Sequence, residues 1–391
     1  QVAYKGDIKA IKETWASLPA GRRELLILLS RFDITPRQAK RWYDEGRRVK
    51  STRYPVTDLG LVENPYRIVE ADLGDDKEPP ISFGAIDRGL LPADTIRVSQ
   101  PVPEPSKVET HSDARRLRAV LAQVLLNAAR EGDTLLSAEE AMERARRYYG
   151  AESVEITLDW LKANSGNLED LIDVRDVEKK GDKPGVITVL QLQDIKGREE
   201  SLRKKLVARA GRQIEFSRQD WVRLLKEAIT AAGSQVDEKN PRHRDALKDQ
   251  ADALARLTAR RLSVLVGRAG TGKTATLGAL LRCQEIKKDG VLLLAPTGKA
   301  RVRLGKAAGA TAMTVAQFLY SLGRYDGARQ RPLFEGKETY RKEKTVVVDE
   351  CSMLTLDDLF AVVSALDLAH VQRLILVGDP NQLPPIGVGR P

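Results

Sequence analysis

Residues 267–274 have the types and the spacing of a phosphate-binding loop. They read GRAGTGKT and match the pattern G-x-x-x-x-G-K-[ST]. Glycines in such a loop let backbone N–H groups surround phosphates, and the N-terminus of the following helix adds the positive end of its dipole. Lys273 would reach the β- and γ-phosphates of a nucleoside triphosphate, and the Thr274 hydroxyl would bind Mg²⁺. The nucleotide contacts that we expect here are Gly267, Arg268, Ala269, Gly270, Thr271, Gly272, Lys273, Thr274 and Ala275.

Two adjacent carboxylates, Asp349 and Glu350, follow the apolar run TVVV at residues 345–348. In a phosphoryl-transfer site, one carboxylate can hold Mg²⁺ while its neighbour orients the attacking water or accepts its proton. Asp349 suits the metal role, and Glu350 suits the catalytic role. An acidic pair after a strand can also be a solvated turn, but its place in the same alternating region as the phosphate loop favours catalysis.

A third polar segment, GDPNQLPP at residues 378–385, follows the apolar run RLILV. Gln382 in this segment could contact the γ-phosphate if the segment lies beside the phosphate loop. Taken alone, the segment would be an ordinary proline-rich turn. The catalytic candidates are therefore Lys273, Glu350 and Gln382, and the magnesium ligands are Thr274 and Asp349.

Short apolar runs that alternate with helical segments must position these residues. The runs are LSVLV, VLLLA, TVVVD and RLILVGD, at residues 262–266, 291–295, 345–349 and 373–379. Continuous apolar strands separated by helices are typical of a parallel sheet covered on both faces, and ligands of such sheets bind at the carboxyl ends of the strands. We therefore expect an α/β fold with helices on both faces of a parallel sheet, preceded by mostly α-helical domains.

Four segments occur in a fixed order along the chain: GRAGTGKT, LLAPTGKAR, VVVDECSM and LVGDPNQLPP. They resemble motifs I, Ia, II and III of the superfamily 1 helicases, and the match is closest to the RecD-like DNA helicases. The resemblance implies a RecA-like P-loop NTPase domain that uses ATP and Mg²⁺ and couples ATP hydrolysis to 5′→3′ DNA unwinding in DNA recombination or repair. It also implies that Gln250 reads adenine; the alternative is an ordinary residue on a helix surface.

The same resemblance implies contacts to DNA at Pro296, Thr297 and Lys299. A threonine hydroxyl can donate to a phosphate oxygen and a lysine can pair with one, and neither reads a base. The alternative is a surface turn with a solvated lysine. Residues 313–318, MTVAQF, stand where relatives have T-[IV]-H-R-L. Thr314 is kept as a DNA contact, but Ala-Gln replaces the His-Arg pair, which puts this second contact in question.

Changes in the pattern of helical and β-type segments along the chain predict three regions: residues 1–100, 101–240 and 241–391. In the first, PRQAKRWYDEGRR predicts one helix, and ENPYRIVEADL with ISFGAIDRGL resembles the helix-hairpin-helix region of stand-alone RecD-like proteins. The second is mainly helical, with Ser137 as a helix cap and VITVLQL as its one short β element. The third is the first RecA-like motor domain. The N-terminal helices contact DNA or form a scaffold, and the sequence leaves both open.

The charge of the chain favours a polyanionic partner, because 65 lysines and arginines against 55 acids give a formal net charge of +10. Two cysteines and three histidines argue against a disulfide scaffold and a His-rich metal site. No apolar stretch approaches the ~20 residues of a membrane span, and no secretory signal is visible. We expect a cytoplasmic, nucleoid-associated protein of bacterial type. Its expected partners are single-stranded DNA and junctions between single- and double-stranded DNA, with a DNA-repair protein as a further possible partner and no membrane.

The first and last residues of the sequence lead us to expect a fragment of a longer protein. It begins with Gln1 and stops at Pro391, directly after the third motif, so we expect a fragment without its second RecA-like domain. That domain would provide arginines, whose contribution to phosphoryl transfer is roughly 10³–10⁵ in rate. The chain alone should then bind ATP and Mg²⁺, hydrolyse ATP poorly and not unwind DNA. The rival functions are a P-loop ATPase of the AAA+ type and a nucleotide-gated scaffold that binds nucleic acid.

Overall fold

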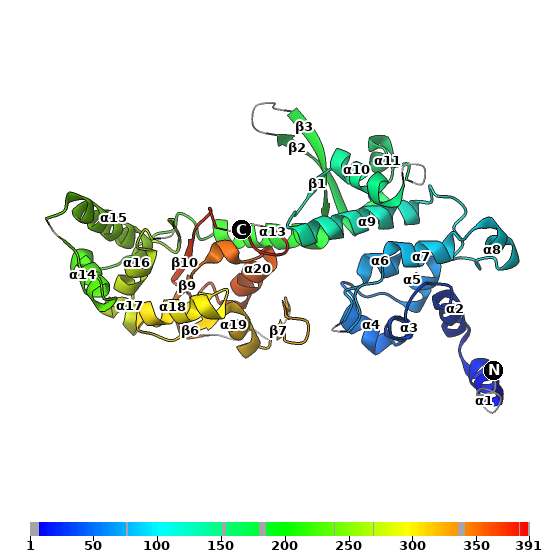
Figure 1. Cartoon of the computed structure of the whole chain (residues 1–391), viewed down its shortest axis with the longest axis horizontal. Helices are drawn as coiled ribbons and strands as arrows, with labels where there is room; N and C mark the ends of the chain where they lie inside the picture. Colours follow the sequence, from blue (N-terminus) through cyan, green and yellow to red (C-terminus); the bar gives the residue numbers. More distant parts are fainter. Residues whose placement is uncertain are drawn as a thin grey trace. The chain divides into compact units, whose positions relative to one another are not determined.

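The computed structural model of the chain describes residues 8–75, 77–150, 154–179, 185–237, 239–268, 270–334, 341–382 and 384–389. The chain forms two compact units (Figure 1). The N-terminal unit contains residues 1–128 and 135–193, and the C-terminal unit contains residues 129–134 and 194–391. The boundary between Gln193 and Asp194 falls inside the middle region predicted from the sequence, and the division at residues 100 and 240 stays a prediction.

Short helices make up the first half of the N-terminal unit. They are α1 (Ile8–Ser17), α2 (Ala20–Leu29), α3 (Pro36–Tyr43), α4 (Glu45–Ser51), α5 (Asp58–Glu63), α6 (Arg67–Ala71), α7 (Phe83–Leu90) and α8 (Asp94–Ser99). The prediction of one helix over PRQAKRWYDEGRR is wrong, because Asp44 divides it. Asp44 has an extended backbone after α3, and its side chain accepts from the Arg47 N–H at 3.0 Å to cap α4.

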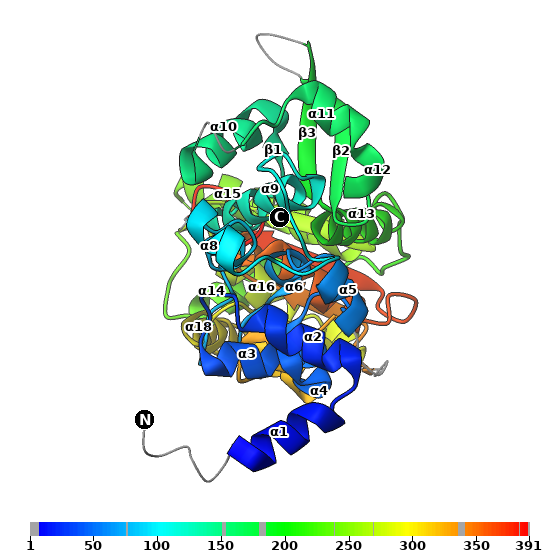
Figure 2. The same ribbon diagram turned by 90° about the vertical axis from the view of Figure 1, so that its right-hand side faces the viewer.

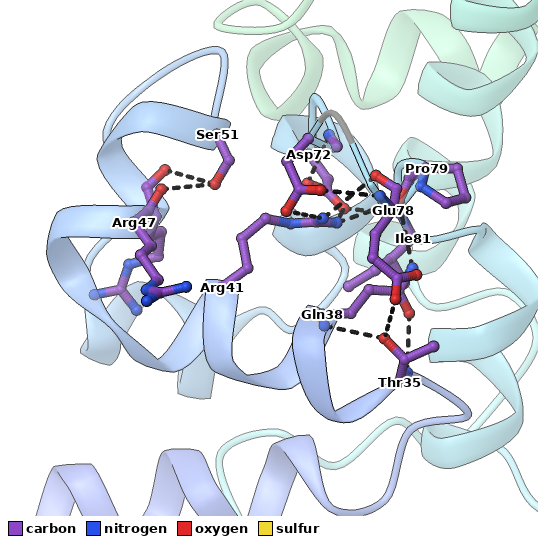
Figure 3. A network of polar contacts seen from close by, with 12 residues as sticks. Thr35, Gln38, Arg41, Arg47, Ser51, Asp72, Glu78, Pro79 and Ile81 are labelled. Carbon is purple, nitrogen blue, oxygen red and sulfur yellow. Dashed lines mark hydrogen bonds and ion pairs between the residues drawn. The ribbon is translucent and has the colours of Figure 1, made fainter. Parts of the chain in front are cut away.

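A buried ion pair holds the loop between α6 and α7 (Figure 3). Arg41 Nη2 donates to Asp72 Oδ2 at 2.8 Å, and the two side chains are 3% and 0% exposed. Asp72 also accepts from the N–H groups of Gly74, at 3.0 Å, and Ile81, at 2.7 Å. Arg41 donates further to the carbonyl oxygen of Pro79 at 3.2 Å. The Asp72 carboxylate therefore provides the acceptor for two backbone N–H groups of this loop, as well as for Arg41.

The rest of the N-terminal unit combines helices with a small antiparallel sheet. Its strands have the order β1 (Leu136–Ser137), β3 (Gly185–Leu192) and β2 (Ile172–Lys179). Figure 2 shows β2 and β3 as long paired strands. The helices are α9 (Ala114–Glu131), α10 (Ala138–Tyr149), α11 (Leu158–Ala163) and α12 (Ser165–Leu168). The N-cap at Ser137 is confirmed, since its hydroxyl accepts from the Glu140 N–H.

The prediction of a single β element in the middle region is wrong, because β1 and β2 accompany β3. Strand β2 reads IDVRDVEK, whose apolar residues are Ile172, Val174 and Val177. They neither form a continuous run nor keep strict alternation, so the usual strand patterns are absent. The strand forms because it pairs along its whole length with β3, where Val189, Leu190 and Leu192 are buried.

A five-stranded sheet lies at the centre of the C-terminal unit. Its order is β4 (Leu262–Val266), β10 (Arg373–Gly378), β9 (Thr345–Val348), β5 (Val291–Ala295) and β6 (Ala312–Thr314), and all neighbours are parallel. Every residue of β9 and β10 is buried, as parallel strands covered on both faces require. The predicted α/β fold class is confirmed. A separate two-stranded sheet pairs β7 (Tyr325–Asp326) with β8 (Arg331–Pro332).

Three helices of this unit precede β4, and the others lie between the strands that follow. They are α13 (Gln193–Val207), α14 (Trp221–Ala231), α15 (Pro241–Thr258), α16 (Lys273–Leu280), α17 (Gln284–Lys288), α18 (Gly298–Ala308), α19 (Val315–Ser321), the 3-10 helix η2 (Cys351–Met353) and α20 (Leu356–Ala365). Helices α14, α15 and α16 pack together (Figure 1). Their buried residues join Leu293, Val347 and Ile375 of the sheet in one hydrophobic core. Residues of α16 belong to this core and Leu265 of β4 packs against it, so the core positions both ends of the loop that connects them.

Candidate functional site

The loop between β4 and α16 has a backbone that only glycine adopts easily. Gly270 has φ +83° and Gly272 has φ +84°, in the left-handed region where a Cβ atom is strained. A Cβ on Gly267 would lie 2.5 Å from Thr271 Oγ1, which donates to the Arg268 carbonyl at 2.8 Å. The loop therefore needs its glycines for curvature and for close approach. Ala269, one of the predicted contacts, lies outside the described residues.

Lys273, at the start of α16, turns back onto this loop. Its ammonium donates to the carbonyl oxygens of Gly267 and of Arg268, the second at 3.2 Å. Thr274 and Ala275 follow in the first turn of α16, where backbone N–H groups have no partners within the helix. A phosphate at this helix end would meet these donors and the positive end of the helix dipole.

Gln250, on α15, lies against the same loop. Its side-chain amide donates to the carbonyl oxygen of Thr271 at 3.3 Å. A Cβ on Gly272 would collide with the same amide nitrogen. Gln250 is therefore not an isolated residue on a helix surface, since it touches the predicted phosphate loop. Its adenine-reading role stays a prediction.

Asp349 and Glu350 follow β9 and are both buried, with exposed fractions of 6% and 5%. The Asp349 N–H donates to the Leu294 carbonyl at 2.9 Å, and Asp349 Oδ1 accepts from the Glu350 N–H at 3.0 Å. Burial raises the pKa of Asp349, and the neighbouring charge of Glu350 adds to it, while the Glu350 N–H, Arg303 and Lys273 oppose the shift. Arg303 and Lys273 thus both act electrostatically on Asp349.

Glu350 has an unusual environment for a carboxylate. Its backbone has φ +51°, a conformation that is costly for a residue with a side chain. One carboxylate oxygen, Oε1, pairs with the Arg303 guanidinium of α18. The other, Oε2, is buried with no hydrogen-bond partner among the described residues. Unsatisfied buried polar atoms and strained backbones concentrate at functional sites.

The ends of three neighbouring strands bring the predicted motifs together. Strand β10 lies between β4 and β9, so the segments that follow them leave the sheet side by side. The Gly267 N–H donates to the Gly378 carbonyl at 3.3 Å, and the Asp379 N–H donates to Ser352 Oγ at 3.3 Å. Gln382 follows in a turn in which its N–H donates to the Asp379 carbonyl at 3.1 Å. Its contact with a γ-phosphate stays a prediction.

The predicted DNA contacts lie at the N-termini of two helices. Thr297 caps α18 by accepting from the Ala300 N–H at 3.2 Å, and Thr314 caps α19 by accepting from the Gln317 N–H at 3.0 Å. Each hydroxyl still has its hydrogen available to donate. Thr297 and Lys299 are exposed, and Pro296 is half-buried. The structure places Thr297 and Lys299 at an exposed helix start and Thr314 at a partly buried one. The contact of all four residues with DNA stays a prediction.

Gln317 has a structural role that the sequence comparison alone did not reveal. Its side chain accepts from the Thr314 N–H at 3.0 Å and completes a reciprocal capping box. Arg301 of α18 donates to the same side-chain oxygen at 3.3 Å. The T-x-x-Q spacing of a capping box is the sequence signal that could have found this role. The replacement of the His-Arg pair therefore leaves Thr314 held in place by Gln317.

Arg303 is the residue of the site that sequence reasoning missed. It stands 47 residues before Glu350 along the chain, in a helix with several other basic residues. No spacing rule connects an arginine on a helix with an acid after a distant strand. The contact exists because β5 pairs with β9, which brings the helix that follows β5 close to the end of β9.

The oxygen atoms of this site fit a magnesium ion. Among the described residues, no three His, Cys, Asp or Glu side chains are grouped to hold a metal ion. Mg²⁺, however, usually takes one or two protein oxygens and completes its shell with water and substrate phosphates. The exposed Thr274 hydroxyl and the buried Asp349 carboxylate are donors of this kind.

None of the helices in the described ranges has both the length and the apolar character of a membrane span.

Comparison with known proteins bears on the C-terminal unit above all. Residues 246–391 match the family model described as AAA domain. An ATP-dependent RecD2 DNA helicase of Deinococcus radiodurans is 38% identical over 144 residues, which cover 37% of this chain and 19% of the relative. The RecBCD enzyme subunit RecD of Mycobacterium tuberculosis is 33% identical over 33% of this chain and 25% of the relative.

A longer match reaches into the N-terminal unit. An uncharacterized protein of Methanocaldococcus jannaschii is 25% identical over 354 residues, which cover 85% of this chain and 28% of the relative. The matched parts of the chain thus span 19% to 28% of the length of these relatives. Taken with the geometry of the site, the matches support a P-loop ATPase domain of the superfamily 1 helicase type in residues 246–391.

Proposed function

We propose that this chain supplies the N-terminal region and the first motor domain of an ATP-dependent DNA helicase or translocase of RecD-like type. One observation carries the proposal: the phosphate loop, the Asp349–Glu350 pair and the loop of Gln382 follow three adjacent strands and lie at one edge of the sheet. The 38% identity with a RecD2 DNA helicase over 144 residues supports it.

Each residue has a chemical role in this proposal. The loop and the first turn of α16, residues 267–275, bind the phosphates of ATP, and Gln250 reads the adenine. Thr274 and Asp349 hold Mg²⁺, which neutralises charge on the β- and γ-phosphates when bound. Glu350 orients the attacking water. Lys273 exchanges the carbonyl oxygens of Gly267 and Arg268 for phosphate oxygens, which are stronger partners for an ammonium group.

The DNA contacts in this proposal are Pro296, Thr297, Lys299 and Thr314. They lie at the starts of α18 and α19, where the positive ends of the helix dipoles favour anions. Contacts to phosphates alone suit a protein that moves along a strand, since they carry no sequence information. By resemblance, the substrate is single-stranded DNA or its junction with duplex, the direction is 5′→3′, and the role is in recombination or repair.

ATP turnover in the intact protein tests the proposal. We expect single-stranded DNA to stimulate ATP hydrolysis, and we expect Lys273→Ala to abolish both hydrolysis and unwinding. Stimulation by a protein substrate, with no response to single-stranded DNA, would instead support a remodelling ATPase of the AAA+ type. Unwinding at the wild-type rate by Lys273→Ala would refute the assignment.

A further inference from the structure

The ion pair between Arg303 and Glu350 joins an exposed cation to a buried anion. The side chain of Arg303 is 58% exposed, whereas that of Glu350 is 7% exposed. A guanidinium with this exposure can leave the pair by rotating into water, where it is well solvated. The buried carboxylate cannot follow. Arg303 can therefore exchange Glu350 for another partner, whereas Glu350 has to stay in place.

The pair leaves Glu350 in a state that does not suit catalysis. Arg303 occupies Oε1, and Oε2 has no hydrogen-bond partner among the described residues. A carboxylate committed to a guanidinium accepts hydrogen bonds from water less readily, because its negative charge is already compensated. The pair with Arg303 thus opposes the water-orienting role proposed for Glu350.

Arg303 also belongs to the helix that carries the proposed DNA contacts. Lys299 precedes it by four residues on α18, so the two side chains lie on one face of the helix, one turn apart. Both are exposed, and Thr297 caps the same helix. A strand whose phosphates bind Thr297 and Lys299 would place the next phosphate within reach of this face. Arginine binds phosphate with two parallel N–H donors and is well suited to such a contact.

We propose that Arg303 exchanges one anion for another: it pairs with Glu350 in the absence of DNA and with a DNA phosphate in its presence. The exchange releases Glu350 to accept a hydrogen bond from the attacking water. Arg303 is then a positioning residue for ATP hydrolysis and an additional sequence-blind DNA contact. The inference rests on the proposed function, and it supplies a physical route by which DNA binding stimulates ATP turnover.

The salt dependence of DNA binding tests the phosphate contact. Each phosphate neutralised on a single strand contributes about −0.7 to the slope of log K against log salt concentration. Arg303→Gln should reduce the magnitude of this slope by about 0.7, and Arg303→Lys should preserve it. Lys306→Gln is the matched control, because it removes one positive charge from the last turn of the same helix and should leave the slope unchanged. An unchanged slope for Arg303→Gln would overturn the contact.

ATP turnover by the intact protein tests the release of Glu350. Arg303→Gln should raise the kcat measured without DNA and lower the ratio of stimulated to unstimulated kcat by about fivefold or more, with the KM for ATP unchanged. Arg303→Lys should restore the ratio, and Lys306→Gln should not alter it. A fall in kcat by the same factor with and without DNA would show that Arg303 only supports the site, and would overturn the exchange. No stimulation in the wild type would overturn the proposed function and the inference together. Normal stimulation in the wild type and in Arg303→Gln alike would overturn the inference alone.

Discussion

The N–H of Gly267 donates a hydrogen bond to the carbonyl oxygen of Gly378 across 3.3 Å. This bond joins the last residue of β10 to the first residue of the phosphate loop, beyond the end of the regular pairing between β10 and β4. The two loops therefore start from fixed positions relative to each other. Two segments more than a hundred residues apart in the chain become parts of one site through the register of the sheet.

Gly272 should be the position of the phosphate loop that tolerates substitution least. Gly272→Ala places a Cβ in a left-handed backbone, which costs about 1–2 kcal/mol, and drives it into the amide of Gln250. We expect the affinity for Mg²⁺ and a fluorescent ATP analogue to fall by tenfold or more, measured by titration. The backbone strain and the collision should also lower the free energy of unfolding of Gly272→Ala. The double variant with Gln250→Ala should recover only part of this loss, because it removes the collision but not the strain.

Gly197→Ala is the matched control for this experiment. Gly197 lies within α13, and a Cβ there meets nothing within 4 Å. Alanine is favoured over glycine inside a helix by about 0.5–1 kcal/mol, so this variant should be at least as stable as the wild type and should bind the nucleotide equally well. Equal tolerance at both positions would contradict the strained conformation of the loop.

Asp72 should be essential to the N-terminal unit and irrelevant to nucleotide binding. Asp72→Ala leaves the buried guanidinium of Arg41 and the N–H groups of Gly74 and Ile81 without their acceptor. Removing one partner of a buried ion pair costs up to about 3–5 kcal/mol, and the second ion pair of Arg41, with Asp75 at 3.2 Å, reduces this cost. We expect the unfolding transition of this unit to shift to lower urea concentration, with an unchanged affinity for the ATP analogue.

The control for Asp72 is Asp33→Ala. Asp33 pairs with Arg88 at 2.6 Å, but the two side chains are 75% and 66% exposed, and exposed pairs contribute at most about 1 kcal/mol. A similar loss of stability in both variants would show that burial of the Arg41–Asp72 pair is not what makes it important. A lower nucleotide affinity in Asp72→Ala would show that the two units depend on each other.

Asp58 should make the N-terminal unit sensitive to acid. Burial alone would raise the pKa of Asp58, but hydrogen bonds from Arg22 at 2.9 Å and Arg48 at 2.6 Å outweigh it and hold the pKa below its ordinary value. Because the folded state binds the proton less tightly than the unfolded state, the pairs stabilise the fold above the unfolded pKa of about 3.9. This stability is lost as the pH falls through the lower, folded pKa.

Urea unfolding between about pH 6 and pH 2 measures this effect. The wild type should lose stability with falling pH across the acidic range, and Asp58→Asn should lose less, since its amide does not titrate. At pH 7 the variant should be the less stable protein, because a neutral amide attracts the two guanidinium groups less strongly. The same pH dependence in both proteins would exclude Asp58 as the source.

The parts of the site that are each encoded by a short sequence pattern could be predicted from the sequence. The strand β4, the loop of Gly267 to Thr274 and the pair Asp349–Glu350 each carry their information within a few residues. The carboxyl ends of parallel strands meet at one edge of a sheet, so even their proximity follows from the order of strands and helices. The structure agrees with the predicted fold class in these respects.

Contacts that depend on three-dimensional packing could not be predicted in this way. Arg303 reaches Glu350 only because β5 and β9 are neighbours. Strand β2 was missed because it is specified by its pairing with β3 rather than by its own alternation. Asp44 is a different case, since a capping residue before EGRR is visible in the sequence, yet a helix continuing through it fits the same residues.

The central claim is that the phosphate loop, the Asp349–Glu350 pair and the loop of Gln382 form one ATP site, and equilibrium binding of a fluorescent ATP analogue to this chain tests it most directly. The account predicts saturable binding that requires Mg²⁺, is weakened about tenfold or more by Lys273→Ala through the loss of a charge-assisted contact, and is unchanged in Lys306→Gln. Equal affinity in the wild type and Lys273→Ala, or binding that is indifferent to Mg²⁺, would contradict it.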